Sequence, residues 1–247
     1  MKYTFLVAAV AGLASALPQT PKPLTRRGGA RPLHHSAPRK NDTAFVEYSS
    51  NWAGAVQIGS GFTTVTGTIT VPSVYNGNGN SAASAWVGID GDTCQTAILQ
   101  TGVSFYGDGT YDAWYEWIPD YSYSFSGFGM SAGDQVRMTV QATSKTTGVA
   151  TLENLSTGRK VSHTFRNTPS TLCETNAEWI VEDFQVGNSL IPFADFGSVT
   201  FTNAYATTAS GGRVTPQGGT IIDIRQSGRV LTSCGTSGSD LTCTYTG

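Results

Sequence analysis

Short runs with period-two alternation of apolar and polar residues recur along this 247-residue chain, and they limit it to a sheet-based fold. The runs are rich in Val, Ile, Thr, Tyr and Trp, and Gly, Ser and Asn turn signals separate them. Apolar residues at helical spacing are scarce. The length suffices for one β-rich domain with a substantial core. We therefore predict an all-β fold, an antiparallel two-sheet β-sandwich.

The first 16 residues read as a secretory signal peptide and not as part of this fold. Lys2 precedes an apolar run, and the run ends in the small residues Ala14-Ser15-Ala16, which suit cleavage after Ala16. We therefore expect a secreted, extracellular protein that matures in an oxidising compartment. No later segment is long and apolar enough to span a membrane, so no membrane partner is expected.

A basic, proline-rich leader follows the signal peptide. Residues 17–40 contain no acid, and the bases in this stretch are Lys22, Arg26, Arg27, Arg31, Arg39 and Lys40. Such a composition cannot bury a core. We predict a pro-segment over residues 17–46, with Arg26-Arg27 as a processing site, and a catalytic domain over residues 47–247.

Charge is divided unevenly between the leader and the body of the chain. All 17 acids lie after residue 40, together with only eight of the 15 bases, so the body carries a net charge of −9. The basic leader should be attracted to this body while its carboxylates are ionised, and the attraction should weaken in acid. The protein's own leader is thus the expected inhibitory partner. An acidic body also argues against nucleic acid as a partner.

Four cysteines allow three pairings. Cys234 and Cys243 flank a hairpin-like turn, which favours pairing them with each other and leaves Cys94 for Cys173. Two Asn-X-Ser/Thr sequons, at Asn41 and Asn154, predict glycosylation sites. The sequence has neither a CxxC motif nor a His/Cys cluster with metal-ligand spacing, so no metal site is expected.

Four strand-like segments each have one apolar face and one face with carboxylates, amides and tryptophans. The segments are SAWVGID, CQTAILQTG, TYDAWYEWI and EWIVEDF. Because alternate residues of a strand share a face, the polar faces carry Trp86, Asp90, Gln100, Asp112, Trp114, Glu116, Glu178 and Glu182. If the segments share a sheet, these faces form one surface that lacks Lys and Arg. That composition suits a substrate groove better than an inert solvent face.

Several chemistries do not fit these residues. A serine-hydrolase triad is disfavoured because His163, the only histidine after the leader, lies in a strand-like run far from any GxSxG motif and reads as an exposed strand residue. A pepsin-like dyad would need two similar halves, which are missing. Acid-base hydrolysis of a glycoside or a peptide and lectin-like sugar binding both remain open, since strand pattern alone does not separate them.

Five longer motifs carry a resemblance to a known family, and this resemblance favours acid-base hydrolysis of peptides over sugar binding. SNWAGAV, SAWVGIDGDTCQTAILQTG, YGDGTYDAWYEWIP, ATLENLSTG and TNAEWIVEDF resemble those of the fungal glutamic peptidases, the eqolisins, in the same order from about Ser50 to the C-terminus. The resemblance implies a jelly-roll, concanavalin-like sandwich. It also implies an acid endopeptidase that acts on proteins and peptides, needs no cofactor and resists pepstatin. This chain has FQVGNSLIPF where some members have additional cysteines.

The resemblance also assigns roles to residues. It places the catalytic glutamine at Gln100 and the catalytic glutamate at Glu182, with further active-site positions at Trp86, Asp90, Asp112 and Glu116. From the strand faces, we expect Trp114 to wall the groove together with Trp86. Glu182 would act as general base toward water, and Gln100 would stabilise the oxyanion. We expect the enzyme to act as a monomer.

Overall fold

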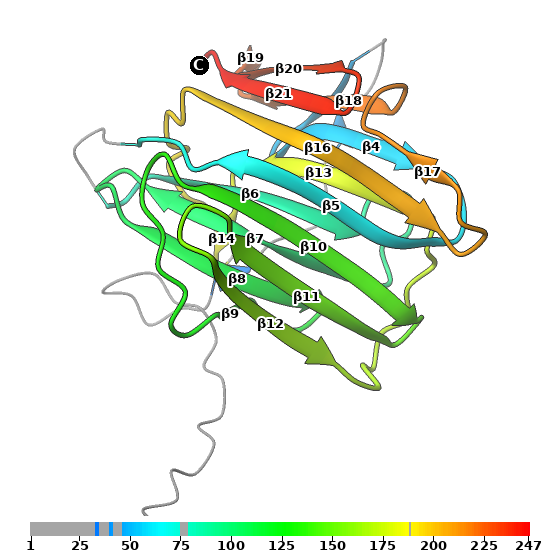
Figure 1. The fold of residues 1–247 in the computed structure, drawn as a ribbon. Coiled ribbons are helices and arrows are strands. Elements are labelled where there is room, and N and C mark those ends of the chain that lie inside the picture. The colour runs from blue at the N-terminus through cyan, green and yellow to red at the C-terminus, as the bar shows by residue number, and fades with distance from the viewer. Residues whose placement is uncertain (1–32, 35–39, 42–45, 75–78, 188) are drawn as a thin grey trace, which may run out of the picture.

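The computed structural model describes residues 33–34, 40–41, 46–74, 79–187 and 189–247. The described residues form strands and turns without a helix, so none of them belongs to a helix long and apolar enough to span a membrane. The predicted signal peptide and most of the predicted pro-segment lie outside the described residues. Two large sheets stack face to face and confirm the predicted two-sheet sandwich (Figure 1).

One large sheet, called here the site sheet, has ten strands, and only its β3–β18 pair is parallel. In order across the sheet, its strands are β2 (Lys40–Asn41), β3 (Glu47–Ser49), β18 (Thr220–Gln226), β4 (Trp52–Ile58), β13 (Asn176–Glu182), β6 (Ala82–Ile89), β7 (Ile98–Tyr106), β8 (Tyr111–Ile118) and β9 (Tyr123–Ser124), with β19 (Arg229–Val230) paired to β18.

The other large sheet, called here the back sheet, has eight antiparallel strands. Its order is β12 (Arg159–Phe165), β11 (Thr147–Asn154), β10 (Gln135–Ser144), β5 (Phe62–Thr70), β16 (Ser198–Thr208), β21 (Asp240–Tyr245) and β20 (Thr232–Ser237), with β17 (Arg213–Val214) paired to β16. A small third sheet joins β1 (Leu33–His34), β14 (Gln185–Val186) and β15 (Ser189–Leu190).

The main core lies between the two large sheets, where each sheet buries its apolar face. The site sheet contributes Val87, Leu99 and Trp179, as period-two alternation predicts. The indole N–H of Trp179 donates to the carbonyl oxygen of Thr66 in the back sheet, at 2.8 Å. This bond satisfies the one polar group of a fully buried ring, so the indole leaves no unpaired donor in the core.

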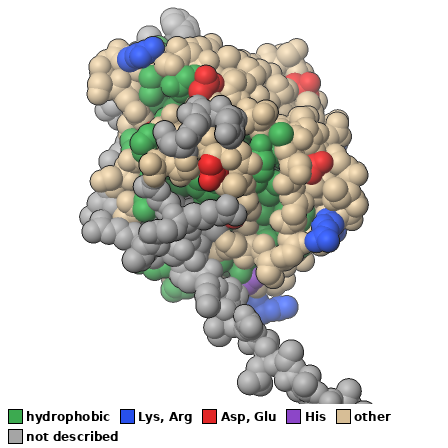
Figure 2. Space-filling model, turned by 90° about the vertical axis from the view of Figure 1, so that its left-hand side faces the viewer, with side chains coloured by type: hydrophobic (Ala, Val, Ile, Leu, Met, Phe, Trp, Pro, Cys, Tyr) green, Lys and Arg blue, Asp and Glu red, His purple; other side chains and the backbone are tan. Residues whose placement is uncertain are grey.

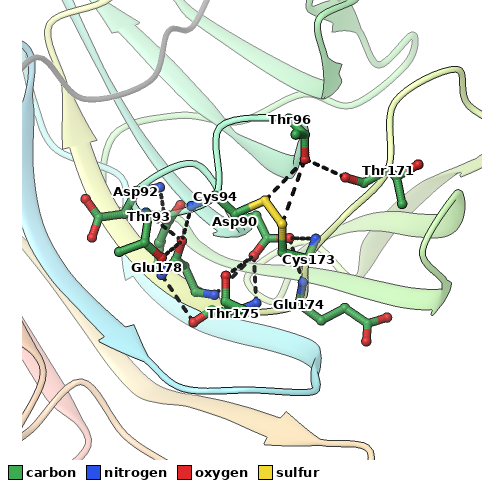
Figure 3. Close-up of a disulfide and its surroundings, with 11 residues drawn as sticks. Asp90, Asp92, Thr93, Cys94, Thr96, Thr171, Cys173, Glu174, Thr175 and Glu178 are labelled. Carbon is green, nitrogen blue, oxygen red and sulfur yellow. Dashed lines mark hydrogen bonds between the residues drawn. A yellow bond between two sulfur atoms is a disulfide. The ribbon is translucent and has the colours of Figure 1, made fainter.

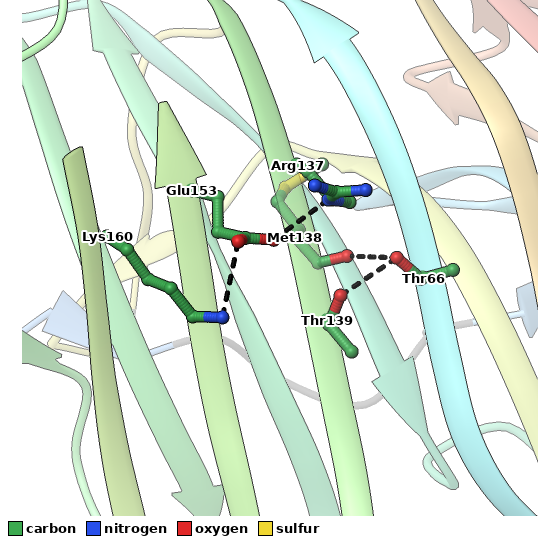
Figure 4. Close-up of polar contacts among 6 residues, drawn as sticks. All are labelled: Thr66, Arg137, Met138, Thr139, Glu153 and Lys160. Atoms are coloured by element: carbon green, nitrogen blue, oxygen red, sulfur yellow. Dashed lines mark hydrogen bonds and ion pairs between the residues drawn. The ribbon is translucent and has the colours of Figure 1, made fainter. Parts of the chain in front are cut away.

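The outer face of the back sheet is polar and carries two ion pairs between described residues. Glu153 on β11 accepts from Arg137 Nε at 2.8 Å and lies 3.2 Å from Lys160 Nζ (Figure 4). Beside this pair, the hydroxyl of Thr66 donates to the carbonyl oxygen of Met138 at 2.9 Å. The alternation of burial along β10 is that of a strand with one face in the core and one in solvent.

Both predicted glycosylation sites, Asn41 and Asn154, lie among the described residues. Asn41 lies in β2, opposite Tyr48. Asn154 is fully buried at the end of β11, where its amide nitrogen donates to Gly129 O at 3.2 Å and to Asp134 Oδ2 at 2.9 Å. A glycan on that nitrogen would replace one of its two N–H groups and so break one of these bonds. In the folded chain this amide is thus engaged in a turn, and glycosylation at both sequons stays a prediction.

Candidate active site

Three rows of directly opposed residues cross β13, β6, β7 and β8. Because residues opposed in antiparallel strands point to the same side, each row lies on one face of the site sheet, and we call the face that turns away from the back sheet the site face. The rows are Glu182–Ser84–Ser104–Asp112, Ile180–Trp86–Gly102–Trp114 and Glu178–Gly88–Gln100–Glu116. The prediction that the polar faces of these segments share one sheet is thus confirmed for seven of the eight residues.

Two glycines make room for the tryptophan side chains within these rows. A Cβ atom at Gly102 would come within 2.5 Å of Trp86 Cβ and 2.8 Å of Trp114 Cζ2. A Cβ atom at Gly88 would come within 2.8 Å of Trp86 Cζ3. The site face therefore has space for two indoles only because the residues between and beside them lack side chains.

Both predicted catalytic residues are held by side-chain hydrogen bonds on the site face. The amide nitrogen of Gln100 donates to Glu116 Oε2 at 2.8 Å. The indole N–H of Trp86 donates to Glu182 Oε2 at 2.9 Å. The first bond orients an amide whose second N–H can serve another acceptor. The second bond gives the carboxylate of Glu182 a neutral donor.

The site face is withdrawn from solvent in the full-length chain. Gln100, Glu116 and Glu182 are fully buried, as are the rings of Trp86 and Trp114, and Asp112 is half-buried. Among the described residues on the molecular face drawn in Figure 2, the Lys and Arg side chains lie toward the margins. Low local dielectric strengthens each of the polar contacts described above, because water competes poorly for buried groups.

Asp90 does not join the rows, so the predicted face is wrong for this residue. β6 ends at Ile89, and Asp90 turns the chain with a φ of 66°. Its carboxylate accepts the backbone N–H groups of Cys173, Glu174 and Thr175 at 2.7–2.8 Å and that of Asn176 at 3.1 Å (Figure 3). Asp90 thus fastens the loop that leads into β13, and alternation failed because the strand had already ended.

A disulfide closes the same loop. Cys94 pairs with Cys173, and Cys234 pairs with Cys243, which confirms both predicted pairings. Asp90, Cys94 and Cys173 place potential metal-ligand atoms within 4.8 Å of one another. Their chemistry does not suit a metal, because the sulfurs are bonded to each other and the carboxylate already accepts four backbone N–H groups.

His163 is neither exposed nor near the rows described above. It lies on β12 of the back sheet, half-buried, with its ring stacked on Tyr115 at a centroid distance of 4.0 Å. Burial lowers the pKa of this imidazole below its usual value. The expectation of an exposed strand histidine is therefore wrong, while its position outside the candidate site agrees with the sequence argument.

Trp52 belongs to the site face but was not among the predicted site residues. It lies on β4 directly opposite Glu182, and its ring meets that of Trp86 edge to face at 4.9 Å. The alternation in NWAGAV would have placed Trp52, Gly54 and Val56 on one face, but nothing in the sequence says that β4 pairs with β13. That pairing joins segments more than 100 residues apart along the chain.

Comparisons with known proteins agree on one family. A family model described as the peptidase A4 family matches residues 50–245. The chain is 58% identical over 228 residues to aspergillopepsin-2 of Aspergillus niger, which covers 83% of this chain and 80% of that protein. It is 48% identical over 228 residues to scytalidopepsin B of Scytalidium lignicola, with 89% and 87% covered.

Solved structures give the same result. The chain matches scytalido-glutamic peptidase with a transition state analog inhibitor at a TM-score of 0.77 and 50% identity, over 80% of this chain and 98% of that chain. It matches aspergilloglutamic peptidase from Aspergillus niger at a TM-score of 0.65 and 60% identity, over 67% and 99%. A related structure of an eqolisin holds the tripeptide Ala-Ile-His, at a TM-score of 0.73 and 48% identity, over 80% and 98%.

Proposed function

This chain belongs to the peptidase A4 family, the eqolisins or glutamic acid peptidases, and from that premise we propose that Glu182 and Gln100 are its catalytic residues. The observation that carries the proposal is the register of the site sheet. It brings a carboxylate and a primary amide to one buried face, each held by its own hydrogen bond. The family also decides against the lectin-like and glycoside-hydrolysing alternatives.

Glu182 acts as general base and then as general acid. The carboxylate takes a proton from water, the water oxygen attacks the carbonyl carbon of the scissile peptide bond, and the same proton then passes to the leaving nitrogen. A neutral donor from Trp86 supports this cycle, since it stabilises the carboxylate without holding it permanently ionised. A lysine or arginine at that position would oppose the protonated half of the cycle.

Gln100 stabilises the oxyanion that forms on the carbonyl oxygen. One amide N–H is engaged by Glu116, which orients the group, and the second N–H donates to the oxyanion. An amide suits acidic conditions because its donor capacity does not change with pH. Asp112 and Trp114 support the site from the neighbouring positions of β8, and Glu116 is a positioning residue because it acts through Gln100.

Digestion of casein at acidic pH in the presence of pepstatin tests these roles. Gln100→Ala should lower kcat by about 10²–10³, as removal of one oxyanion donor usually does. Glu182→Gln should abolish turnover, while the circular dichroism spectrum of each variant stays that of the parent. Near-normal digestion by either variant would refute the assignment.

Glu178→Gln is the matched control for the general base. Glu178 lies on the same strand and the same face as Glu182, is equally buried, and accepts the backbone N–H of Asp92 at 3.2 Å. Because it lies at the far end of β13, the Glu178→Gln variant should retain measurable activity where Glu182→Gln retains none. An equal loss of activity in both variants would mean that activity needs every buried carboxylate on this face, and would contradict a special role for Glu182.

We also propose that residues 17–46 are a pro-segment that keeps the enzyme latent. Two short pairings support this: β1 adds to β14, which begins three residues after Glu182, and β2 adds to β3. The candidate catalytic residues are fully buried in the full-length chain, which a latent precursor requires. The two disulfides are consistent with an oxidising compartment, and secretion through a signal peptide over residues 1–16 is part of the same proposal.

A synthetic peptide of residues 17–40 tests the pro-segment. It should inhibit the matured enzyme at mildly acidic pH and release it on further acidification, because protonation of the body's carboxylates removes the attraction. A peptide with its six bases replaced by Gln is the control and should inhibit much less. Inhibition that strengthens in acid, or that is equal for both peptides, would contradict an electrostatic pro-segment.

A further inference from the structure

Asp183 is a buried acid beside the proposed general base, and the mechanism above leaves it unused. It directly follows Glu182 and is 1% exposed. Burial raises the pKa of its carboxyl to about 7, the charge of Glu182 adds to this rise, and a hydrogen bond from Gln226 opposes it. Asp183 is therefore neutral in the acidic range where the enzyme acts.

Gln226 joins Asp183 to a second part of the chain. Its amide nitrogen donates to Asp183 Oδ2 at 2.7 Å and to the carbonyl oxygen of Ser50 at 2.8 Å. The backbone N–H of Asp183 in turn donates to the carbonyl oxygen of Asn51 at 2.9 Å. We call these three bonds the clasp. It fastens the end of β13 to the β3–β4 turn and to the end of β18.

The clasp is connected to the proposed general base through packed neighbours. The β3–β4 turn ends at Trp52, which lies opposite Glu182. The ring of Trp52 packs on Trp86, and Trp86 donates to Glu182 Oε2. A shift of the turn would therefore move the ring that holds the donor of Glu182, in addition to loosening the strand end that carries Glu182.

Among the residues that the structure describes, the groups around Asp183 do not favour its charged form. From β18 comes the neutral amide of Gln226, while the guanidinium of the adjacent Arg225 lies over the ring of Tyr48, 4.3 Å from its centroid. The β3–β4 turn presents neutral groups, and its Ser49 hydroxyl is engaged with Asn51. β13 presents Glu182, whose negative charge opposes ionisation. Asp183 Oδ1 meanwhile has no hydrogen-bond partner among the described residues.

We propose that Asp183 is a positioning residue whose neutral carboxyl keeps the clasp closed in acid, and whose ionisation opens this end of the site as the solution is neutralised. The inference rests on the proposed role of Glu182. It extends that role by naming a second acid that sets the upper pH limit of the folded site. Since a buried carboxylate with a single donor is poorly stabilised, the ionised form favours local opening.

Urea unfolding of the full-length chain at several pH values tests the proposal. It is made in a Gln100→Ala background, which keeps the carboxyl group of Glu182 and slows self-digestion. Asp183→Asn is compared with its parent. The ratio of their unfolding constants should change by on the order of a hundred- to a thousandfold between about pH 4 and about pH 8, since a folded pKa of about 7 replaces 3.8 and each unit is tenfold.

The direction of that change follows from the raised pKa. The parent gains from the neutral carboxyl below about pH 4 and loses this gain as the pH rises toward 7, whereas the side-chain amide of the Asp183→Asn variant cannot ionise. Asp195→Asn, at an exposed acid, is the control and should leave the pH dependence as it is in the parent. A ratio for Asp183→Asn that stays constant with pH would overturn the proposal.

A second experiment separates positioning from stability alone. Gln226→Met, with Gln100 intact, removes the donor of the clasp and should lower kcat at acidic pH by about tenfold with KM changed less than about twofold, because the general base is displaced and substrate contacts are not. An unchanged kcat would refute the positioning role. Activity retained by Glu182→Gln would refute the proposed function instead, and the unfolding result for Asp183→Asn would still stand.

Discussion

At the residue scale, the packing at the centre of the site face depends on Gly102, which has a hydrogen atom in place of a side chain. Trp86 and Trp114 flank this position in the middle row, and a Cβ atom there would overlap both side chains and approach the Ala85 carbonyl oxygen to 2.5 Å. Trp86 also carries the donor to Glu182. The absence of a side chain at Gly102 therefore affects both the packing of the site face and the position of the donor to Glu182.

Gly102→Ala should destabilise the fold by about 1–3 kcal/mol, the usual cost of overpacking a core. It should also lower kcat, since the indole that donates to Glu182 must move. Gly129→Ala is the matched control, because nothing lies within 4 Å of a Cβ atom built at Gly129. Thermal unfolding and casein digestion measure both effects; a Gly102→Ala enzyme indistinguishable from the Gly129→Ala enzyme would contradict this account of the rows.

At the scale of elements, β13 is held at both ends by carboxylates. Asp90 accepts four backbone N–H groups before the strand begins, and Asp183 accepts Gln226 after it ends. Glu178 and Glu182 lie between them on the site face. The acids of this segment therefore have two roles: Glu178 and Glu182 lie on the site face, and Asp183 anchors the strand end, while Asp90 anchors the other end from the turn after β6.

Asp90→Asn separates anchoring from catalysis. The variant should lose about 2 kcal/mol of stability, because charge-assisted bonds to backbone N–H groups become weaker neutral ones. Well below its unfolding temperature, the folded variant should keep substantial activity on casein. Loss of all activity with an unchanged unfolding temperature would instead indicate a direct part for Asp90 in the reaction.

At the scale of the molecule, stability should be greatest in acid. Burial raises the pKa of Asp183 to about 7 and raises that of Asp223, where hydrogen bonds from Thr232 and Cys234 oppose the rise. Groups with raised pKa values stabilise the fold below their unfolded pKa and lose that contribution as the pH rises through the folded one. Both acids therefore favour the folded chain in acid.

Glu153 has the opposite, weaker effect: it stabilises the folded chain at neutral pH more than in acid. Partial burial would raise its pKa, yet hydrogen bonds from Lys160 and Arg137 outweigh this and lower it, so its contribution is lost as the pH falls. Its side chain is 25% exposed and its partners are 44% and 61% exposed, so the pairs contribute at most about 1 kcal/mol. Protonation of the body's carboxylates thus removes little stability through this route.

The unfolding temperature should consequently be higher at about pH 4 than at about pH 8, by at least about 5 °C for a chain of this size. Scanning calorimetry across that range measures it, and reversal of the trend by Asp183→Asn together with Asp223→Asn would identify the groups responsible. A midpoint that rises from acid to neutral pH would show that ion pairs outweigh the buried acids.

By itself, the sequence determined the strand faces, the two disulfides and the family. Alternation is a local property of extended backbone, so Trp86, Gln100, Glu116 and Glu182 could be placed on one side of their strands before any pairing was known. The family motifs then selected Gln100 and Glu182 among the acids and amides of that face.

Only the tertiary structure decided which residues contact each other across the chain. The turn at Asp90, the buried amide of Asn154 and the ring of Trp52 opposite Glu182 depend on which segments fold against each other. The clasp is the clearest case, because Gln226 binds Ser50 across a separation of 176 residues. Alternation states which way a side chain points, but what it meets is set by long-range packing that no local pattern encodes.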